Sequence, residues 1–185
     1  MLKWTLILVI LLIGIPTTVK AADFTLDPEN VNKRLELRMG LGIKSVKDPA
    51  GNKVSPGRMI EAAFIHQPLD GYKLFYYDVS IGGWTTKDVA SGNQGLLLGA
   101  GAGLRYDWDV FYVMGGPGVA YSSNTTNGLI STPLEFTIAA SVGAKVGKFG
   151  VGVYYKHISN GNSSTVIKPN HGLNFLGADI NFWSW

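Results

Sequence analysis

Long stretches of the chain alternate between apolar residues and polar or small ones with a period of two. In the stretch 34–43 every odd-numbered residue is apolar, while the even-numbered positions hold arginine, glutamate and glycine. The stretches 95–107 and 134–146 largely repeat this pattern, with glycine and polar residues between the apolar positions. Successive side chains of a β-strand point to opposite faces of the sheet, so the alternation predicts strands with one apolar and one polar face.

Turn residues divide the chain into eight such segments. The predicted strands are residues 34–45, 58–66, 72–84, 95–107, 109–121, 134–146, 149–159 and 171–184. Long polar connections at 46–57, 85–94, 122–133 and 160–170 alternate with short turns at 67–71, 107–109 and 147–148. An even number of strands of about ten residues, joined in this way, is typical of bacterial outer-membrane barrels. The pattern therefore predicts an all-β fold, an eight-stranded antiparallel transmembrane β-barrel of the outer membrane.

The polar stripes of the predicted strands indicate which face lies inside. A soluble sandwich or lipocalin-like barrel would alternate as well, but its apolar face would point inward. Here the stripes carry charges of both signs that can pair inside a narrow lumen. These charged residues are Arg34, Glu36, Arg38, Asp78, Arg105 and Glu135. Aromatic residues near the predicted strand ends, namely Tyr76, Tyr77, Trp84, Tyr106 and Trp108, are expected in girdles at the membrane interfaces.

Residues 1–21 have the layout of an export signal. Lys3 precedes an almost unbroken apolar run, and Val19-Lys20-Ala21 offers small residues at the two key positions of a cleavage site. The apolar run has about a dozen residues, whereas an anchor helix needs about 20. We therefore expect a signal peptide over 1–21 and a single barrel domain over 22–185, located in the bacterial cell outer membrane.

Composition and charge narrow the classes of partner. The chain has 185 residues, no cysteine and a formal net charge of +3. Residues 1–21 contain two lysines and no acid, so the remainder holds 14 basic against 13 acidic residues. A nucleic-acid-binding protein normally shows a larger or more clustered basic excess, so nucleic acid is not an expected partner. None of the three histidines has acidic neighbours at metal-ligand spacing, so we expect no metal and no cofactor.

The long connections and strand ends on the predicted outer side are basic. They contain Lys44, Lys47, Lys53, Arg58, Lys87, Lys156 and Lys168, against Asp48 and Asp88. Two interpretations stay open. The charges either keep the loops soluble or attract the phosphorylated lipid of the outer leaflet.

A histidine and a serine lie two residues apart at the predicted outer end of a strand. His157 and Ser159 continue the apolar, lipid-facing row of Val151, Val153 and Tyr155. At this spacing the imidazole can act as a base towards the hydroxyl. The pair alone leaves two interpretations open, a catalytic pair or two polar residues of the membrane interface.

The surroundings of this pair resemble a known enzyme family. The segment Tyr155-Lys156-His157-Ile158-Ser159-Asn160, the polar loop after it and Pro169-Asn170-His171-Gly172 resemble the lipid A 3-O-deacylases of the PagL type. The resemblance implies an eight-stranded outer-membrane barrel that hydrolyses the ester at position 3 of lipid A, part of lipopolysaccharide in the outer leaflet. It implies that Ser159 is the nucleophile, that His157 is its general base and that Asn160 helps to stabilise the oxyanion. Members of the family can pair in the membrane, so a homodimer stays open.

One position departs from the family pattern. The family's acid follows the Pro-Asn-x-Gly turn by two residues, and here that position is Asn174. Its parity places it on the lipid-facing side of the last strand, next to the strand of His157. An asparagine can orient a histidine through its amide oxygen, but it brings no charge to stabilise an imidazolium. We therefore expect His157, Ser159 and Asn174 as the catalytic residues, with Asn160 at the oxyanion.

Two other functions compete with this one. The departure at Asn174 favours a non-catalytic structural or adhesive small outer-membrane barrel, in which His157 and Ser159 merely belong to the rim. A pore is disfavoured, because an eight-stranded lumen is just wide enough for side chains. The expected function is therefore that of a serine carboxylic-ester hydrolase acting on lipid A.

Overall fold

The computed structural model describes residues 33–47, 53–67, 75–87, 94–125, 130, 132–146, 149–160 and 172–183. The long strands are β1 (Lys33–Gly42), β4 (Pro56–His66), β5 (Phe75–Thr86), β6 (Gln94–Trp108), β7 (Phe111–Ser122), β8 (Leu134–Val146), β9 (Phe149–Ser159) and β10 (Leu173–Trp183). The short strands β2 (Val46–Lys47) and β3 (Lys53–Val54) pair with each other. No helix in the described part of the chain is long and apolar enough to cross a membrane.

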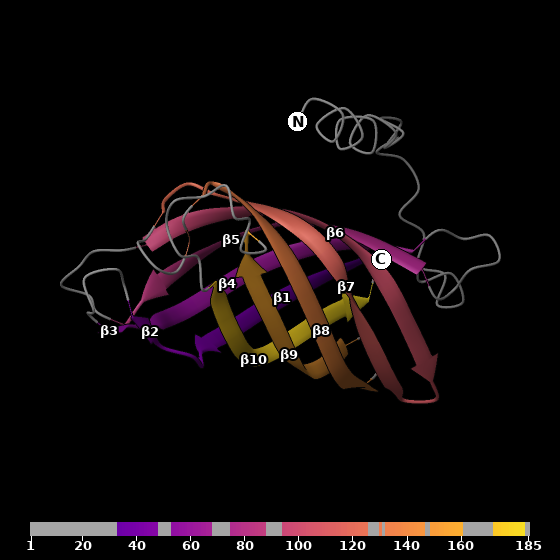
Figure 1. Ribbon diagram of the computed structural model, residues 1–185. Helices are drawn as coiled ribbons and strands as arrows, with labels where there is room; N and C mark the ends of the chain where they lie inside the picture. Colours follow the sequence, from indigo (N-terminus) through magenta and orange to yellow (C-terminus); the bar gives the residue numbers. More distant parts are fainter. Residues whose placement is uncertain are drawn as a thin grey trace, which may run out of the picture.

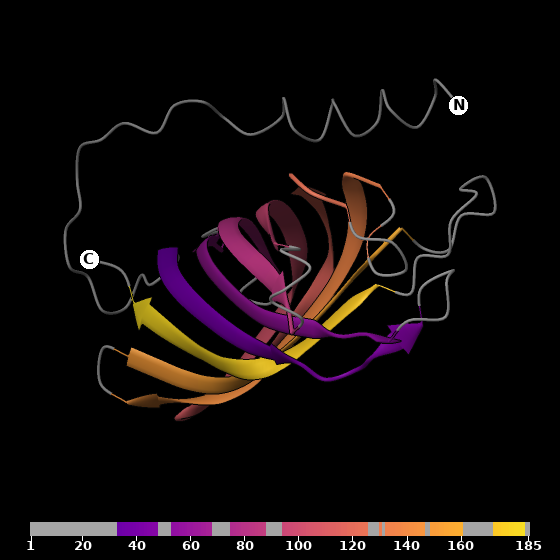
Figure 2. The same ribbon diagram turned by 90° about the vertical axis from the view of Figure 1, so that its left-hand side faces the viewer.

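The eight long strands close into an antiparallel barrel, as Figures 1 and 2 show. Closure is made between the first and last strands, where Arg34 lies opposite Trp183 and Gly42 lies opposite Phe175. We call the edge where β1 begins and β10 ends the terminal rim. The other edge, where β9 ends and β10 begins, is the loop rim. This architecture confirms the fold class predicted from the alternating pattern.

The predicted strand positions agree closely with the structure. The bounds of β8 and β9 coincide with the predicted segments, and the ends of the other six differ by at most three residues. The hairpin of β2 and β3 lies within the predicted connection 46–57, where no strand was expected. The expected signal peptide, residues 1–21, lies outside the described residues, as do most of the connection 160–170 and the last two residues of the chain.

The outer wall of the barrel is apolar. Along β1 the odd-numbered residues are exposed, and after Lys33 they are all leucine or methionine, while the even-numbered residues are buried. Along β8 the exposed residues include Leu134, Phe136, Ile138 and Val142. A closed barrel pairs its backbone groups internally, so such a wall suits the hydrocarbon of a membrane. The assignment of the apolar face to the outside is confirmed.

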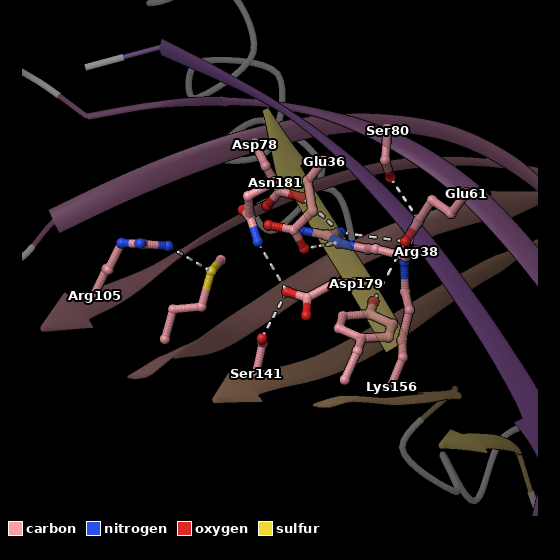
Figure 3. A network of polar contacts seen from close by, with 12 residues as sticks. Glu36, Arg38, Glu61, Asp78, Ser80, Arg105, Ser141, Lys156, Asp179 and Asn181 are labelled. Carbon is pink, nitrogen blue, oxygen red and sulfur yellow. Dashed lines mark hydrogen bonds and ion pairs between the residues drawn. The ribbon is translucent and has the colours of Figure 1, made fainter. Parts of the chain in front are cut away.

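Ion pairs fill the middle of the lumen (Figure 3). Arg38 of β1 lies 2.6 Å from Glu36 and 3.2 Å from both Glu61 and Asp78. Lys156 of β9 forms an ion pair with Glu61 from the other side of the lumen. Four strands are thereby tied together through buried charges, and the prediction that the charged stripes face inward is confirmed.

A second polar cluster lies next to the first, around Asp179 of β10. Its carboxylate accepts hydrogen bonds from Ser141 at 2.7 Å, from Tyr112 at 3.1 Å and from Asn181 at 3.2 Å. Beside these clusters a cavity of about 20 Å³ remains between Arg38 and the opposite wall. Such a volume holds about one water molecule. Side chains therefore occupy most of the described lumen.

Two aromatic residues expected in the interface girdles point into the lumen instead. Tyr76 and Trp84 are buried, and the indole N–H of Trp84 donates a hydrogen bond to the Ser122 hydroxyl at 3.0 Å. The reason is parity, because both lie at the inward-facing even-numbered positions of β5. Tyr106 and Trp108 are exposed on the outer wall near the terminal rim, as expected.

Lys156 also lies elsewhere than predicted. It was expected among the basic residues of the outer side, yet its side chain is buried and reaches Glu61. Even-numbered residues of β9 face inward, so the residue next to His157 belongs to the lumen. Basic residues that do lie exposed near the loop rim are Lys44, Lys53, Arg58 and Lys87.

Candidate active site

The candidate site is built on the loop-rim ends of two adjacent strands, β9 and β10. His157 and Ser159 are both odd-numbered residues of β9, so their side chains leave the same outward face. The Nε2 atom of His157 lies 2.9 Å from the hydroxyl oxygen of Ser159. The spacing of two residues therefore does bring the base and the hydroxyl within hydrogen-bond distance.

Asn174 reaches the same histidine from the neighbouring strand. It is the direct register partner of His157 in the β9–β10 ladder, and its Oδ1 lies 3.0 Å from Nδ1 of His157. Because a carbonyl oxygen only accepts hydrogen bonds, this contact requires the proton on Nδ1. Nε2 is then free to accept the Ser159 hydroxyl proton. The three residues that the sequence singled out form one hydrogen-bonded chain.

Tyr155 extends this chain by one further residue. Its hydroxyl donates a hydrogen bond to Oδ1 of Asn174 at 2.8 Å, so that oxygen accepts from two donors. The alternating pattern places Tyr155 in the lipid-facing row and indicates no role for it. Tyr155 lies two residues before His157 on the same outward face, which indicates that the two are neighbours. Its contact with Asn174, however, depends on side-chain length and strand register.

Gly172 packs directly against the serine and the histidine. Its φ angle is 71°, in the left-handed region that residues with a side chain rarely adopt. A Cβ atom added there would lie 2.8 Å from Cε1 of His157 and 2.9 Å from Cβ of Ser159. The glycine of the Pro-Asn-x-Gly segment is therefore required both by the backbone and by the space beside the pair.

Asn160 follows Ser159 directly, at the end of β9. Its side chain is buried, with 7% of its surface exposed. Among the other ionisable residues, Glu135 lies buried in the lumen, where the Thr132 hydroxyl donates a hydrogen bond to its carboxylate at 2.9 Å. His66 lies at the terminal rim beside Tyr77, with ring centroids 5.0 Å apart. His171 and Lys168 lie outside the described residues.

The cluster lies in the apolar outer wall. On β8, the register partners of His157 and Ser159 are Ile138 and Phe136, which are 59% and 62% exposed. On the other side, the backbone N–H of Ile43 donates to the Asn174 carbonyl oxygen at 3.1 Å, and the Ile43 side chain is exposed. The hydroxyl, the imidazole and the amide therefore lie where the acyl chains of a lipid would lie.

A closed barrel with an apolar outer wall that carries a serine–histidine–asparagine chain has the make-up of a membrane-embedded hydrolase. Comparison with known protein families matches residues 61–183 to the family described as lipid A 3-O-deacylase (PagL). The chain belongs to this family, and the matched residues include His157, Ser159, Asn160 and Asn174. Searches of curated proteins and of solved structures return no match.

Proposed function

We propose that this protein removes the 3-O-linked 3-hydroxyacyl chain of lipid A in the outer membrane, with Ser159 as nucleophile. Membership of the PagL family supports lipid A deacylase activity in general. The observation that carries the finer proposal is the chain Ser159–His157–Asn174, with contacts of 2.9 and 3.0 Å on a wall facing lipid.

In the first half of the reaction, the Ser159 oxygen attacks the ester carbonyl carbon while Nε2 of His157 takes the hydroxyl proton. Asn160 stabilises the developing oxyanion through its side chain or its backbone N–H. The tetrahedral intermediate then expels the sugar oxygen, which takes the proton from His157. The products of this half are a deacylated lipid and an acyl group bonded to Ser159.

In the second half, water replaces the sugar hydroxyl. His157 takes a proton from the water as its oxygen attacks the acyl carbon, and the Ser159 oxygen leaves and recovers a proton from the same imidazole. The released product is a 3-hydroxy fatty acid. The sum of the two halves is the hydrolysis of one ester bond, and it needs no metal or cofactor.

Asn174 gives this site a neutral third member. In serine proteases, replacing the triad aspartate by asparagine costs about 10⁴-fold in turnover, because the histidine takes the wrong tautomer. Here the amide presents its oxygen to Nδ1 at 3.0 Å, which is the orientation that the reaction needs. The arrangement therefore avoids the wrong tautomer, although the imidazolium formed during the reaction has no carboxylate beside it.

The membrane setting completes the proposal. Residues 1–21 direct export, residues 22–185 form the barrel, and the loop rim faces outward, so that the site meets lipid A in the outer leaflet. The exposed Lys44, Lys53, Arg58 and Lys87 near that rim suit the phosphate groups of such a lipid. Pairing of two barrels in the membrane remains a prediction from the family resemblance.

Incubation of the purified protein in detergent with lipid A, followed by mass spectrometry of the lipid, tests this function. We expect the loss of one 3-hydroxyacyl unit with wild type and intact lipid with Ser159→Ala. An Asn160→Ala variant separates the two oxyanion donors, because only a side-chain donor would lower turnover by about 10²- to 10³-fold. Intact lipid from correctly folded wild type would instead favour a structural or adhesive barrel.

A further inference from the structure

The amide of Asn174 has two orientations of nearly the same shape, and they differ in which group faces His157. With Oδ1 towards the ring, Nδ1 of His157 carries the proton and Nε2 accepts the Ser159 hydroxyl. With Nδ2 towards the ring, the amide N–H would donate to a bare Nδ1, and the ring proton would move to Nε2. That second tautomer cannot take a proton from Ser159. A carboxylate has no such ambiguity, because both of its oxygens accept.

We propose that Tyr155 is a positioning residue that selects the productive orientation of the Asn174 amide and thereby sets the tautomer of His157. The inference rests on the proposed function for its catalytic meaning. Its structural basis is the single oxygen, Oδ1 of Asn174, which accepts from the Tyr155 hydroxyl at 2.8 Å and lies 3.0 Å from Nδ1 of His157.

The Tyr155 phenol favours the orientation with Oδ1 towards His157, because its hydroxyl proton needs an acceptor and Oδ1 then provides one. If the amide were reversed, the Tyr155 proton would lose Oδ1 as its acceptor. Asn174 is only 9% exposed, Tyr155 is half-buried and the wall around the cluster is apolar, so solvent competes weakly for that proton. An unsatisfied donor in such surroundings is costly. The Tyr155 hydroxyl thus keeps the acceptor oxygen of Asn174 towards His157. A carboxylate would present an acceptor oxygen in either orientation.

Tyr155 is also placed to act on the amide without touching the reacting groups. It lies opposite Leu176 in the β9–β10 ladder, one outward position below the His157–Asn174 pair. Ser159 lies at the other end of the cluster, beyond the imidazole. The effect of Tyr155 therefore passes through Asn174 and His157, which makes it a positioning residue and not a catalytic one.

Comparison of Tyr155→Phe in two backgrounds tests this role. In the natural Asn174 background we expect turnover of lipid A to fall about tenfold, on the scale of one hydrogen bond. In an Asn174→Asp background, where both oxygens accept, we expect Tyr155→Phe to change turnover by less than about twofold. Tyr121→Phe is the control, because Tyr121 is an exposed tyrosine near the loop rim and away from the cluster. It should keep wild-type turnover.

A second measurement reports the tautomer independently of turnover. In ¹⁵N-labelled full-length protein in detergent, the ring nitrogens of His157 are assigned by their disappearance in His157→Gln. We expect wild type to carry the proton on Nδ1 and Tyr155→Phe to show a mixture of both tautomers. The Asn174→Asp background should keep the proton on Nδ1 with either residue at position 155.

Two results would overturn the inference: an unchanged tautomer in Tyr155→Phe, or equal losses of turnover in the two backgrounds, which would mark Tyr155 as packing only. Failure of the proposed function looks different. In that case wild type leaves lipid A intact, while the tautomer measurement still decides whether Tyr155 orients the amide.

Discussion

His157 and Asn174 lie directly opposite each other on β9 and β10, although 17 positions separate them in the sequence. The backbone register sets the two side chains on the same outward face, and the imidazole and the amide meet at 3.0 Å. Neither strand alone holds the site. The ladder between them positions the base, so a change at either residue should weaken the proposed reaction.

Asn174→Ala removes the acceptor for the Nδ1 proton while leaving the outer wall apolar. We expect turnover of lipid A to fall by about 10²-fold or more, the scale of a positioned general base, since the imidazole loses its orientation. Kinetics with purified lipid A measure the loss. Ala178→Gly is a control on the same outward row of β10, and it should leave turnover within about twofold. An Asn174→Ala variant as active as wild type would remove Asn174 from the mechanism.

Gly172→Ala should abolish activity without unfolding the barrel. The left-handed φ of 71° strains any residue with a side chain, and the new Cβ would push against His157 and Ser159. Gly83→Ala is the matched control, because the nearest atom to a Cβ there is a backbone oxygen at 3.5 Å. Circular dichroism of both variants checks the strands, and the lipid A assay checks the site. Full activity of Gly172→Ala would contradict the packing described.

Glu61→Gln should destabilise the barrel strongly. It leaves the buried Lys156 ammonium without its ion-pair partner, and breaking a buried pair from one side costs about 3–5 kcal/mol. Urea unfolding in lipid vesicles measures the change in the free energy of unfolding. Removing both charges, in Glu61→Gln with Lys156→Gln, should cost less than Glu61→Gln alone. If the double variant is less stable than Glu61→Gln, the unpaired Lys156 ammonium is not the cause of the lost stability.

A charged residue on the outer wall should lower the free energy of unfolding by an amount that depends on its depth in the membrane. Val142 and Val146 are both exposed on β8, but Val142 lies near the middle of the strand and Val146 at its terminal-rim end. In vesicles we expect Val142→Arg to lower the free energy of unfolding by about 2–4 kcal/mol, and Val146→Arg by about 1 kcal/mol or less. Equal costs at the two positions would contradict the proposed membrane span.

The strands were predictable because their pattern is local. The alternation in 134–146 and the turn residues after it identify both ends of β8, and the same turn begins β9. Nearness to a strand end does not predict the inward orientation of Tyr76 and Trp84, because parity along β5 decides which face a side chain leaves. The hairpin of β2 and β3 was missed because two residues in each strand are too few to show a period.

The site was predictable only in part. Parity placed His157 and Ser159 on one face, but which residue of β10 lies opposite depends on the register, which a long connection leaves open. Asn174 was reached through the family resemblance, and the register then proved to match it. The alternating pattern shows which face a residue lies on but not how far apart two side chains are. It therefore could not predict the contact of Tyr155 with the amide oxygen or the packing of Gly172.

The pairing of β1 with β10 bears on the stage of assembly at which the candidate site becomes complete. Asn174 belongs to the strand that closes the barrel, and its backbone carbonyl is held by Ile43, just past the end of β1. A chain that has not yet joined its first and last strands lacks this backbone hydrogen bond, and Asn174 is then held only by the β9–β10 ladder. We therefore expect the proposed hydrolase to reach full activity only once its barrel has closed, so that assembly and activation become a single event.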